Sequence, residues 1–200
     1  EATYGHISTW ATGDVTDMSF LFCSGSWCSY YNSAASSFNE DISAWATSSV
    51  TTMYRMFRGA SAFNNPIGDW SIGNVKNMEL MFGYAGSFNQ AIGDWSVGAV
   101  TTMNSMFEGA TNFDQDLSDW NVRPDCDFSA MFYQAFAFQN GGNQDLGWCT
   151  LFSDFYVEDA SFLRIQNLQV GYTVPLADDL KGLFLGPLSN FRVYISVNNA

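Results

Sequence analysis

Three aspartates recur at 25-residue intervals, each directly before a tryptophan: Asp69, Asp94 and Asp119. If equivalent residues stack in neighbouring layers, their carboxylates lie about 5 Å apart, the spacing of adjacent strands. Carboxylates that close repel one another unless water or a cation screens them, and Ca²⁺ accepts oxygen ligands in loose geometry. The column is therefore a candidate calcium site. We favour the simpler alternative, a solvated acidic stripe or aspartates that bond their own turn backbone.

A second candidate is the insertion 23–32, which interrupts the 25-residue spacing and carries Trp27, Tyr30 and Tyr31. Aromatic side chains on a rigid loop could stack on sugars or form a hot spot in a protein interface. Insertions in repeat arrays often lie on the binding face. The alternative is that this segment caps the open end of the hydrophobic core, and we favour the cap slightly over the binding face.

The four cysteines form two candidate disulfide pairs. Cys23 and Cys28 lie five residues apart in the insertion and could close a small ring, whereas Cys126 and Cys149 lie on neighbouring repeats and could join them. Free or buried thiols are the alternative. An even cysteine count fits an oxidising compartment. A zinc site is not expected, because no Cys-x-x-Cys motif occurs and the single histidine, His6, is distant in sequence from the second pair.

The chain carries none of the common catalytic signatures. Gly-x-Ser-x-Gly and glycine-rich phosphate-binding motifs are absent, and His6 has no recognisable nucleophile motif around it. Pairs of carboxylates occur, but an acidic chain supplies them by chance. We therefore expect no enzymatic activity.

These candidate residues belong to a repeat marked by tryptophans. The marker positions are Trp45, Trp70, Trp95, Trp120 and Trp148, with three steps of 25 residues and a last step of 28. Val-x-x-Met-x-x-Met-Phe-x-x-Ala follows the first four markers with variations, and its apolar spacing predicts a short helix or helical turn. Ile-x-x-Trp is too short for a helix and predicts a short strand. A unit of this size cannot bury two apolar faces alone, so we expect the repeats to stack, with every methionine in the core.

A polar column directly follows the recurring phenylalanine of each repeat. Its members are Asn39, Asn64, Asn89, Asp114 and Gln139. Contact with calcium or another ligand is one interpretation of this column. We favour side chains that pair with backbone groups at each turn, as internal polar ladders do in stacked repeats.

Charge argues against nucleic-acid binding, and hydropathy argues against a transmembrane helix. The net charge is −13, and sixteen of the 20 acidic residues but only four of the seven Lys and Arg residues precede Phe155, which places −12 on the repeats. An acidic surface repels phosphates, so we expect no nucleic-acid binding. The sequence contains no run of 18 apolar residues, so we expect no transmembrane helix. No signal peptide is present either, and we interpret the chain as a mature or trimmed segment.

The repeat motif resembles a known family. Phe-Asn-x-x-Ile-x-x-Trp-x-x-x-x-Val-x-x-Met-x-x-Met-Phe-x-x-Ala is similar to the BspA-like surface-protein repeat, catalogued as DUF285, over about residues 1–150. The resemblance implies a leucine-rich-repeat-like α/β solenoid with about 25 residues per turn. It also implies a secreted or surface-anchored protein, with adhesion as a use of several relatives, and this setting favours the disulfides over free thiols. No catalytic residues come with the family.

The last part of the chain has a different likeness. Residues 155–175 and 188–199 resemble two late strands of the β-barrel of SusC-type TonB-dependent outer-membrane transporters. We therefore expect a repeat domain over 1–154, with its insertion at 23–32, followed by a β-hairpin-like segment over 155–200. Two strands do not close a barrel, which needs at least about eight.

The sequence thus predicts a non-enzymatic extracellular or cell-surface module that presents an acidic, aromatic-bearing face for adhesion or ligand capture. The expected partner is a protein or a glycan on a cell surface, and no cofactor is expected apart from the candidate calcium. The alternative is an extracellular-loop elaboration and barrel fragment of a SusC-type transporter for glycan or peptide uptake, associated with the outer membrane through residues 160–200.

Overall fold

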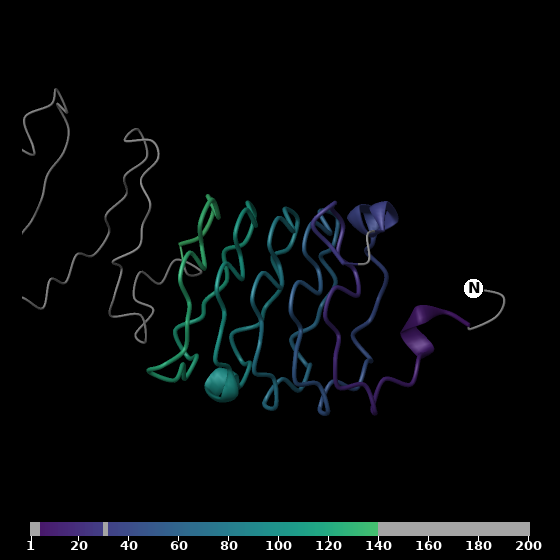
Figure 1. Ribbon diagram of the computed structural model, residues 1–200, viewed down its shortest axis with the longest axis horizontal. Helices are drawn as coiled ribbons and strands as arrows, with labels where there is room; N and C mark the ends of the chain where they lie inside the picture. Colours follow the sequence, from purple (N-terminus) through teal and green to yellow (C-terminus); the bar gives the residue numbers. More distant parts are fainter. Residues whose placement is uncertain (1–4, 30–31, 140–200) are drawn as a thin grey trace, which may run out of the picture. The chain divides into compact units, whose positions relative to one another are not determined.

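A computed structural model describes residues 5–29 and 32–139 of the 200-residue chain. These residues form a row of similar coils, each lying beside the next (Figure 1). The helices among them are the short 3₁₀ elements η1 (Ile7–Thr9), η2 (Ser33–Ser37) and η3 (Val97–Ala99). Within this part of the chain, no helix is long and apolar enough to cross a membrane. The expected domain boundary at 154 and the hairpin over 155–200 lie outside the described residues.

Where the sequence predicts a short helix or helical turn after a tryptophan, the described residues form consecutive tight turns. The Met53 carbonyl accepts the Met56 N–H at 3.1 Å, and the Phe57 carbonyl accepts the Ala60 N–H at 2.9 Å. Each turn spans four residues, with a hydrogen bond from the last N–H to the first carbonyl, so apolar side chains at intervals of three and four point to one side. That interval is close to the 3.6-residue period of a helix, so the same apolar spacing fits a helix and a run of turns.

The turns place left-handed backbone at two recurring positions of the coils. The first position has φ between 53° and 60° in Phe20, Arg55, Leu80, Ser105 and Ala130. The second has φ between 58° and 75° in Gly59, Tyr84, Gly109 and Gln134. The third residue of a type II turn needs positive φ and is usually glycine. Most of these positions hold other residues, so the packing of neighbouring coils must offset the backbone strain.

Backbone hydrogen bonds between coils replace those that a helix would make internally. Met53 N–H donates to the Asn77 carbonyl at 2.9 Å, and Met78 N–H donates to the Thr102 carbonyl at 2.9 Å. Residues 55, 57 and 59 likewise donate to the next coil, while 56, 58 and 60 donate backward within their own turns. Parallel bridges therefore run along the row through Asp17, Thr52, Asn77, Thr102 and Asp127.

The Ile-x-x-Trp segment, which the sequence predicts to be a short strand, forms a turn in the described residues. Trp70 N–H donates to the Ile67 carbonyl at 3.1 Å, and the same bond recurs from Trp95 to Ile92. A hydrogen bond across four residues pulls the backbone out of the extended form that a strand needs. The strand-like pairing lies instead at the bridge positions described above.

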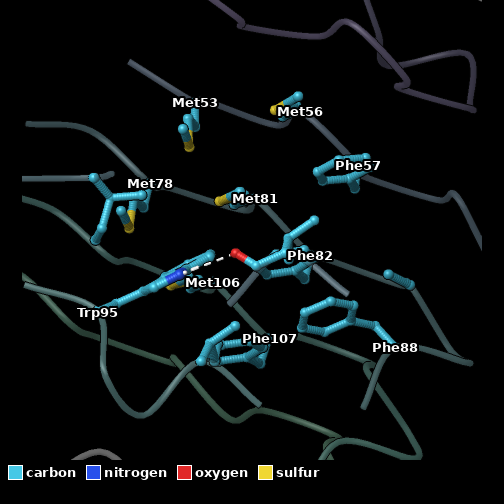
Figure 2. Packing of buried hydrophobic residues seen from close by; sticks show 14 of the residues in the cluster. Met53, Met56, Phe57, Met78, Met81, Phe82, Phe88, Trp95, Met106 and Phe107 are labelled. Carbon is cyan, nitrogen blue, oxygen red and sulfur yellow. Dashed lines mark hydrogen bonds between the residues drawn. The ribbon is translucent and has the colours of Figure 1, made fainter. Parts of the chain in front are cut away.

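Each buried tryptophan joins its coil to the preceding one. The Trp70 indole N–H donates to the Ile42 carbonyl at 3.2 Å, although Trp70 belongs to the next coil. The Trp95 indole donates in the same way to the Ile67 carbonyl at 3.3 Å, the bond drawn in Figure 2. The isoleucine carbonyl also accepts the backbone N–H of the tryptophan in its own coil, so both of its lone pairs are used.

Phenylalanine rings and methionines fill the remaining core. Phe57, Phe82 and Phe107 stack with ring centroids 5.6 Å apart and planes within 6° of parallel. A second column of rings packs against the first, with Phe88 only 3.9 Å from Phe82 (Figure 2). All eight methionines are buried, which confirms the sequence prediction: Met18, Met53, Met56, Met78, Met81, Met103, Met106 and Met131.

The polar column forms the predicted ladder. The Asn39 side-chain oxygen accepts the Asn64 N–H at 2.8 Å, and the Asn64 oxygen accepts the Asn89 N–H at 2.9 Å. The chain of bonds continues through Asp114 to Gln139. The prediction that these side chains satisfy turn backbone in the adjacent coil is confirmed.

Replacing Trp95 by Phe removes one indole hydrogen bond and part of a buried ring. We expect the free energy of unfolding to fall by about 2 kcal/mol or more, from a lost hydrogen bond of about 1 kcal/mol and the cavity left behind. Chemical denaturation followed by circular dichroism measures the change. Trp10→Phe is the matched control, because Trp10 is half exposed and its indole makes no hydrogen bond with a described residue. Equal effects of the two substitutions would contradict the structural role of the indole bond.

Replacing Gln134 by Gly relieves strain at an exposed left-handed position, where φ is 58°. We expect the variant to be more stable by about 0.5–1 kcal/mol, since positive φ is unfavourable for residues with a Cβ. Thermal unfolding compares it with Asn112→Gly, which places glycine at an exposed position without positive φ and is expected to lose stability. A loss in both variants would show that the turn carries no strain.

Candidate functional site

The three predicted aspartates do lie along one shallow groove. Asp69 and Asp94 line a pocket of about 560 Å³, and Asp94 and Asp119 line a second pocket of about 390 Å³ that shares Asp94 and Ser96 with the first. All three carboxylates are exposed. Across residues 5–29 and 32–139, no group of three or more His, Cys, Asp or Glu side chains is placed to hold a metal ion. The exposure of the three carboxylates agrees with the favoured interpretation of this column, a solvated acidic stripe.

Other aspartates bond their own turns. The Asp41 carboxylate accepts the Ser43 N–H at 2.9 Å, and Asp116 accepts both the N–H and the hydroxyl of Ser118. The bond from the Ser43 backbone lowers the pKa of Asp41, and the bond from the Ser118 hydroxyl lowers that of Asp116. Both lie four residues before a tryptophan, a position that Pro66 and Ala91 occupy in the two repeats between them, so this turn bond forms only where the repeat supplies an aspartate.

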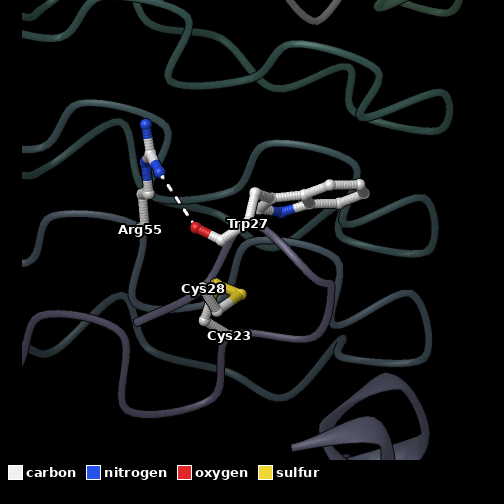
Figure 3. The surroundings of a disulfide bond; sticks show 4 residues. All are labelled: Cys23, Trp27, Cys28 and Arg55. Carbon is white, nitrogen blue, oxygen red and sulfur yellow. Dashed lines mark hydrogen bonds between the residues drawn. A yellow bond between two sulfur atoms is a disulfide. The ribbon is translucent and has the colours of Figure 1, made fainter. Parts of the chain in front are cut away.

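The insertion folds into a disulfide-closed loop against the neighbouring coil. Cys23 and Cys28 form a disulfide, as the sequence predicted (Figure 3). Ser24 N–H donates to the Arg58 carbonyl at 2.8 Å, and the chain approaches Gly59 so closely that a Cβ there would lie 2.1 Å from the Ser24 carbonyl oxygen. The loop is thus fixed at both its disulfide and its backbone.

Trp27 lies on this loop beside side chains from two coils. The Arg58 guanidinium is 4.7 Å from the centroid of the Trp27 ring, and the Tyr84 ring centroid is 6.4 Å away. The Trp27 carbonyl accepts a hydrogen bond from Arg55 Nη1 at 3.4 Å (Figure 3). Trp27 is nevertheless 49% exposed and Tyr84 39% exposed. Both rings therefore offer apolar surface to a partner.

Two arginines complete the cluster, and sequence reasoning missed both. Arg55 lies 4.7 Å from the Tyr54 ring centroid, and Arg58 contacts Trp27 and Tyr84. We name this surface the aromatic–arginine patch, consisting of Trp27, Tyr54, Arg55, Arg58 and Tyr84. The available signal was composition: these are two of only four Lys and Arg residues before position 155. Only the fold shows that they meet beneath the inserted tryptophan.

Burial and hydrogen bonding shift the pKa values of two side chains in this patch. Burial lowers the pKa of Arg58, because desolvation disfavours the charged form, although Arg58 stays protonated at neutral pH. The Tyr84 hydroxyl donates a hydrogen bond to the Glu108 carboxylate, and that bond raises the pKa of Tyr84. Neither arginine forms an ion pair with a described residue. The patch is thus a small cationic region on an acidic surface.

Cys126, a member of the second predicted cysteine pair, lies outside the patch. Cys126 is a free thiol in the buried core, and burial raises its pKa to about 11. This differs from the expected disulfide with Cys149, because the Cys126 side chain faces the core. Cys149 itself lies outside the described residues, as do Tyr30 and Tyr31 of the predicted aromatic set.

Reduction tests both cysteine assignments. We expect dithiothreitol to lower the free energy of unfolding of the native chain by about 2 kcal/mol, the value for a short closed loop. The Cys23→Ala/Cys28→Ala variant should show no response to the reductant, and Cys126→Ser should respond as the native chain does. Urea denaturation with and without reductant measures these differences. A reductant response in the double variant would reveal a second disulfide and contradict the free thiol at Cys126.

Comparison with known proteins identifies the repeat. The family model described as "Mycoplasma protein of unknown function, DUF285" matches residues 1–98 and, in a second overlapping match, residues 26–148. No curated protein and no solved structure matches the chain significantly. The two family matches together cover most of the chain and coincide with the stacked coils, and so the protein belongs to the DUF285 family, as its repeat motif predicted.

Proposed function

We propose that this chain is a non-enzymatic extracellular module that binds a surface partner through the aromatic–arginine patch, in adhesion or ligand capture. The observation that carries the proposal is the placement of Trp27. The insertion leaves the 25-residue repeat, is closed by a disulfide, and holds a half-exposed indole over the stack. A core-capping role would instead bury this side chain.

The energetics of recognition support this choice. Tryptophan, tyrosine and arginine are the residues that most often dominate binding energy when they lie together at an interface. Trp27, Arg58 and Tyr84 already contact one another, so a partner does not have to order them. Pre-ordering removes about 0.5–1.5 kcal/mol of entropic cost for each side chain that would otherwise be immobilised.

An extracellular or cell-surface location agrees with the same features. Disulfides persist in oxidising compartments, and the Cys23–Cys28 bond closes the very loop that positions Trp27. The net charge of −13 opposes nucleic-acid binding. The expectation that the chain is not an enzyme stays a prediction. The SusC-type alternative and any outer-membrane association depend on residues 155–200, outside the described part of the chain, and stay predictions as well.

The Trp27→Ala variant tests this proposal. We expect it to reduce retention of protein-coated beads on immobilised glycans and extracellular-matrix proteins by about tenfold or more, the effect of losing an interface hot spot. Phe136→Ala is the matched control, because Phe136 is a 78% exposed aromatic outside the patch. Thermal unfolding verifies that both variants fold. Equal retention of the two variants would contradict the patch as the binding surface.

A further inference from the structure

We infer that the aromatic–arginine patch recognises a single carboxylated sugar, such as a uronic acid, at the end of a glycan. This inference rests on the proposed function and adds the chemical class of the ligand. It follows from the charge, the fixed geometry and the backbone pairing around the patch.

Local charge selects one anionic group rather than a polyanion. Arg55 and Arg58 bring two positive charges to a surface whose repeats carry −12 in total. Glu108 adds a negative charge at the edge of the patch, where it is hydrogen-bonded to Tyr84. The patch therefore has a local excess of one positive charge. A long polyanion would lie over the acidic surface on either side and be repelled there, whereas one carboxylate would contact the patch alone and be repelled far less.

The arginines are held in place by rings rather than by counter-ions. Arg55 lies against Tyr54, and Arg58 lies against Trp27 and Tyr84. Their Nε atoms are buried without a hydrogen-bond partner among the described residues. The Arg58 guanidinium makes no hydrogen bond or ion pair within the described part of the chain. A carboxylate reaching its terminal nitrogens would form the paired bonds for which the planar guanidinium is suited, and would offset its desolvation.

The Trp27 indole would contact the sugar ring that carries the carboxylate. Trp27 is half exposed, and the Arg58 guanidinium lies 4.7 Å from its ring centroid. A carboxylate bound at Arg58 would place the ring that carries it beside the exposed indole, within a distance that one sugar ring can span. The apolar C–H face of the sugar would cover the indole, while its hydroxyls remain free to bond Glu108 or water.

Backbone pairing disfavours an acidic peptide. An extended peptide gains affinity chiefly by adding a strand to a free edge. The coil beneath Trp27 has no such edge, because the carbonyls of Tyr54, Met56 and Arg58 accept N–H groups from the preceding coil. On its other side, the N–H groups of residues 53, 55, 57 and 59 donate to the following coil. A peptide would therefore be limited to side-chain contacts.

Titration calorimetry on the full 200-residue chain tests this inference with two probes. One is a soluble oligosaccharide ending in glucuronic acid, and the other ends in glucose, so that they differ only in the carboxylate. We expect the acidic probe to bind about 10- to 100-fold more tightly, the effect of a hydrogen bond to a charged group. Arg58→Gln should abolish the difference, and Arg58→Lys should reduce it because lysine lacks the planar fork. Arg123→Gln, outside the patch, should behave as the native chain.

Other outcomes would overturn the inference. They are equal affinity for the two probes, no measurable binding of the acidic probe at millimolar concentration, or equally tight binding of a short peptide with one acidic side chain. The comparison of two probes on the native chain does not depend on any variant folding correctly. If Trp27→Ala still impairs retention on surfaces while the probes bind equally, the proposed function stands and only the ligand class is wrong.

Discussion

Hydrogen bonding from each coil to the next is the constraint on which the rest of the structure depends. The N–H of Met53 has its partner in Asn77, 24 residues later, and the indole of Trp70 has its partner in Ile42, 28 residues earlier. Buried polar groups without such partners are costly, so no coil is stable by itself. Stability is therefore shared along the row, as in other repeat proteins, and depends on every layer having a neighbour.

The same constraint explains how the stacked coils can carry the insertion 23–32 on their surface. Core columns are occupied by phenylalanine, methionine and tryptophan, whose rings and chains stack with their counterparts 25 residues away. The ten-residue insertion leaves those columns intact, because Phe22 still stacks on Phe57 and Phe38 on Phe63. Its extra chain is displaced to the surface, where the Cys23–Cys28 disulfide restrains it. Trp27 is thus added without disturbing the stack.

Local structure was the least predictable part of the chain. The spacing of Val50, Met53, Met56 and Phe57 is compatible with a helix or with successive turns, because both bring every third or fourth residue to one face. Only the inter-coil bonds decide between them. The positive φ at Leu80, Tyr84 and Ser105 could not be predicted from the sequence either, since these residue types are not typical of left-handed backbone. The polar ladder from Asn39 to Gln139 was predictable, because its 25-residue interval and amide chemistry specify both the spacing and the partner.

The sequence by itself determined the repeat length, the family, the buried methionines and the first disulfide, because each follows from periodic spacing or from short separation along the chain. Tertiary structure alone decided that the coils are built from turns, that Cys126 faces the core, and that Arg55 and Arg58 meet Trp27. The physical reason is that these features arise from contacts between residues about 24 to 31 positions apart, and neither local propensity nor periodicity specifies which outward-facing side chains of adjacent coils will touch.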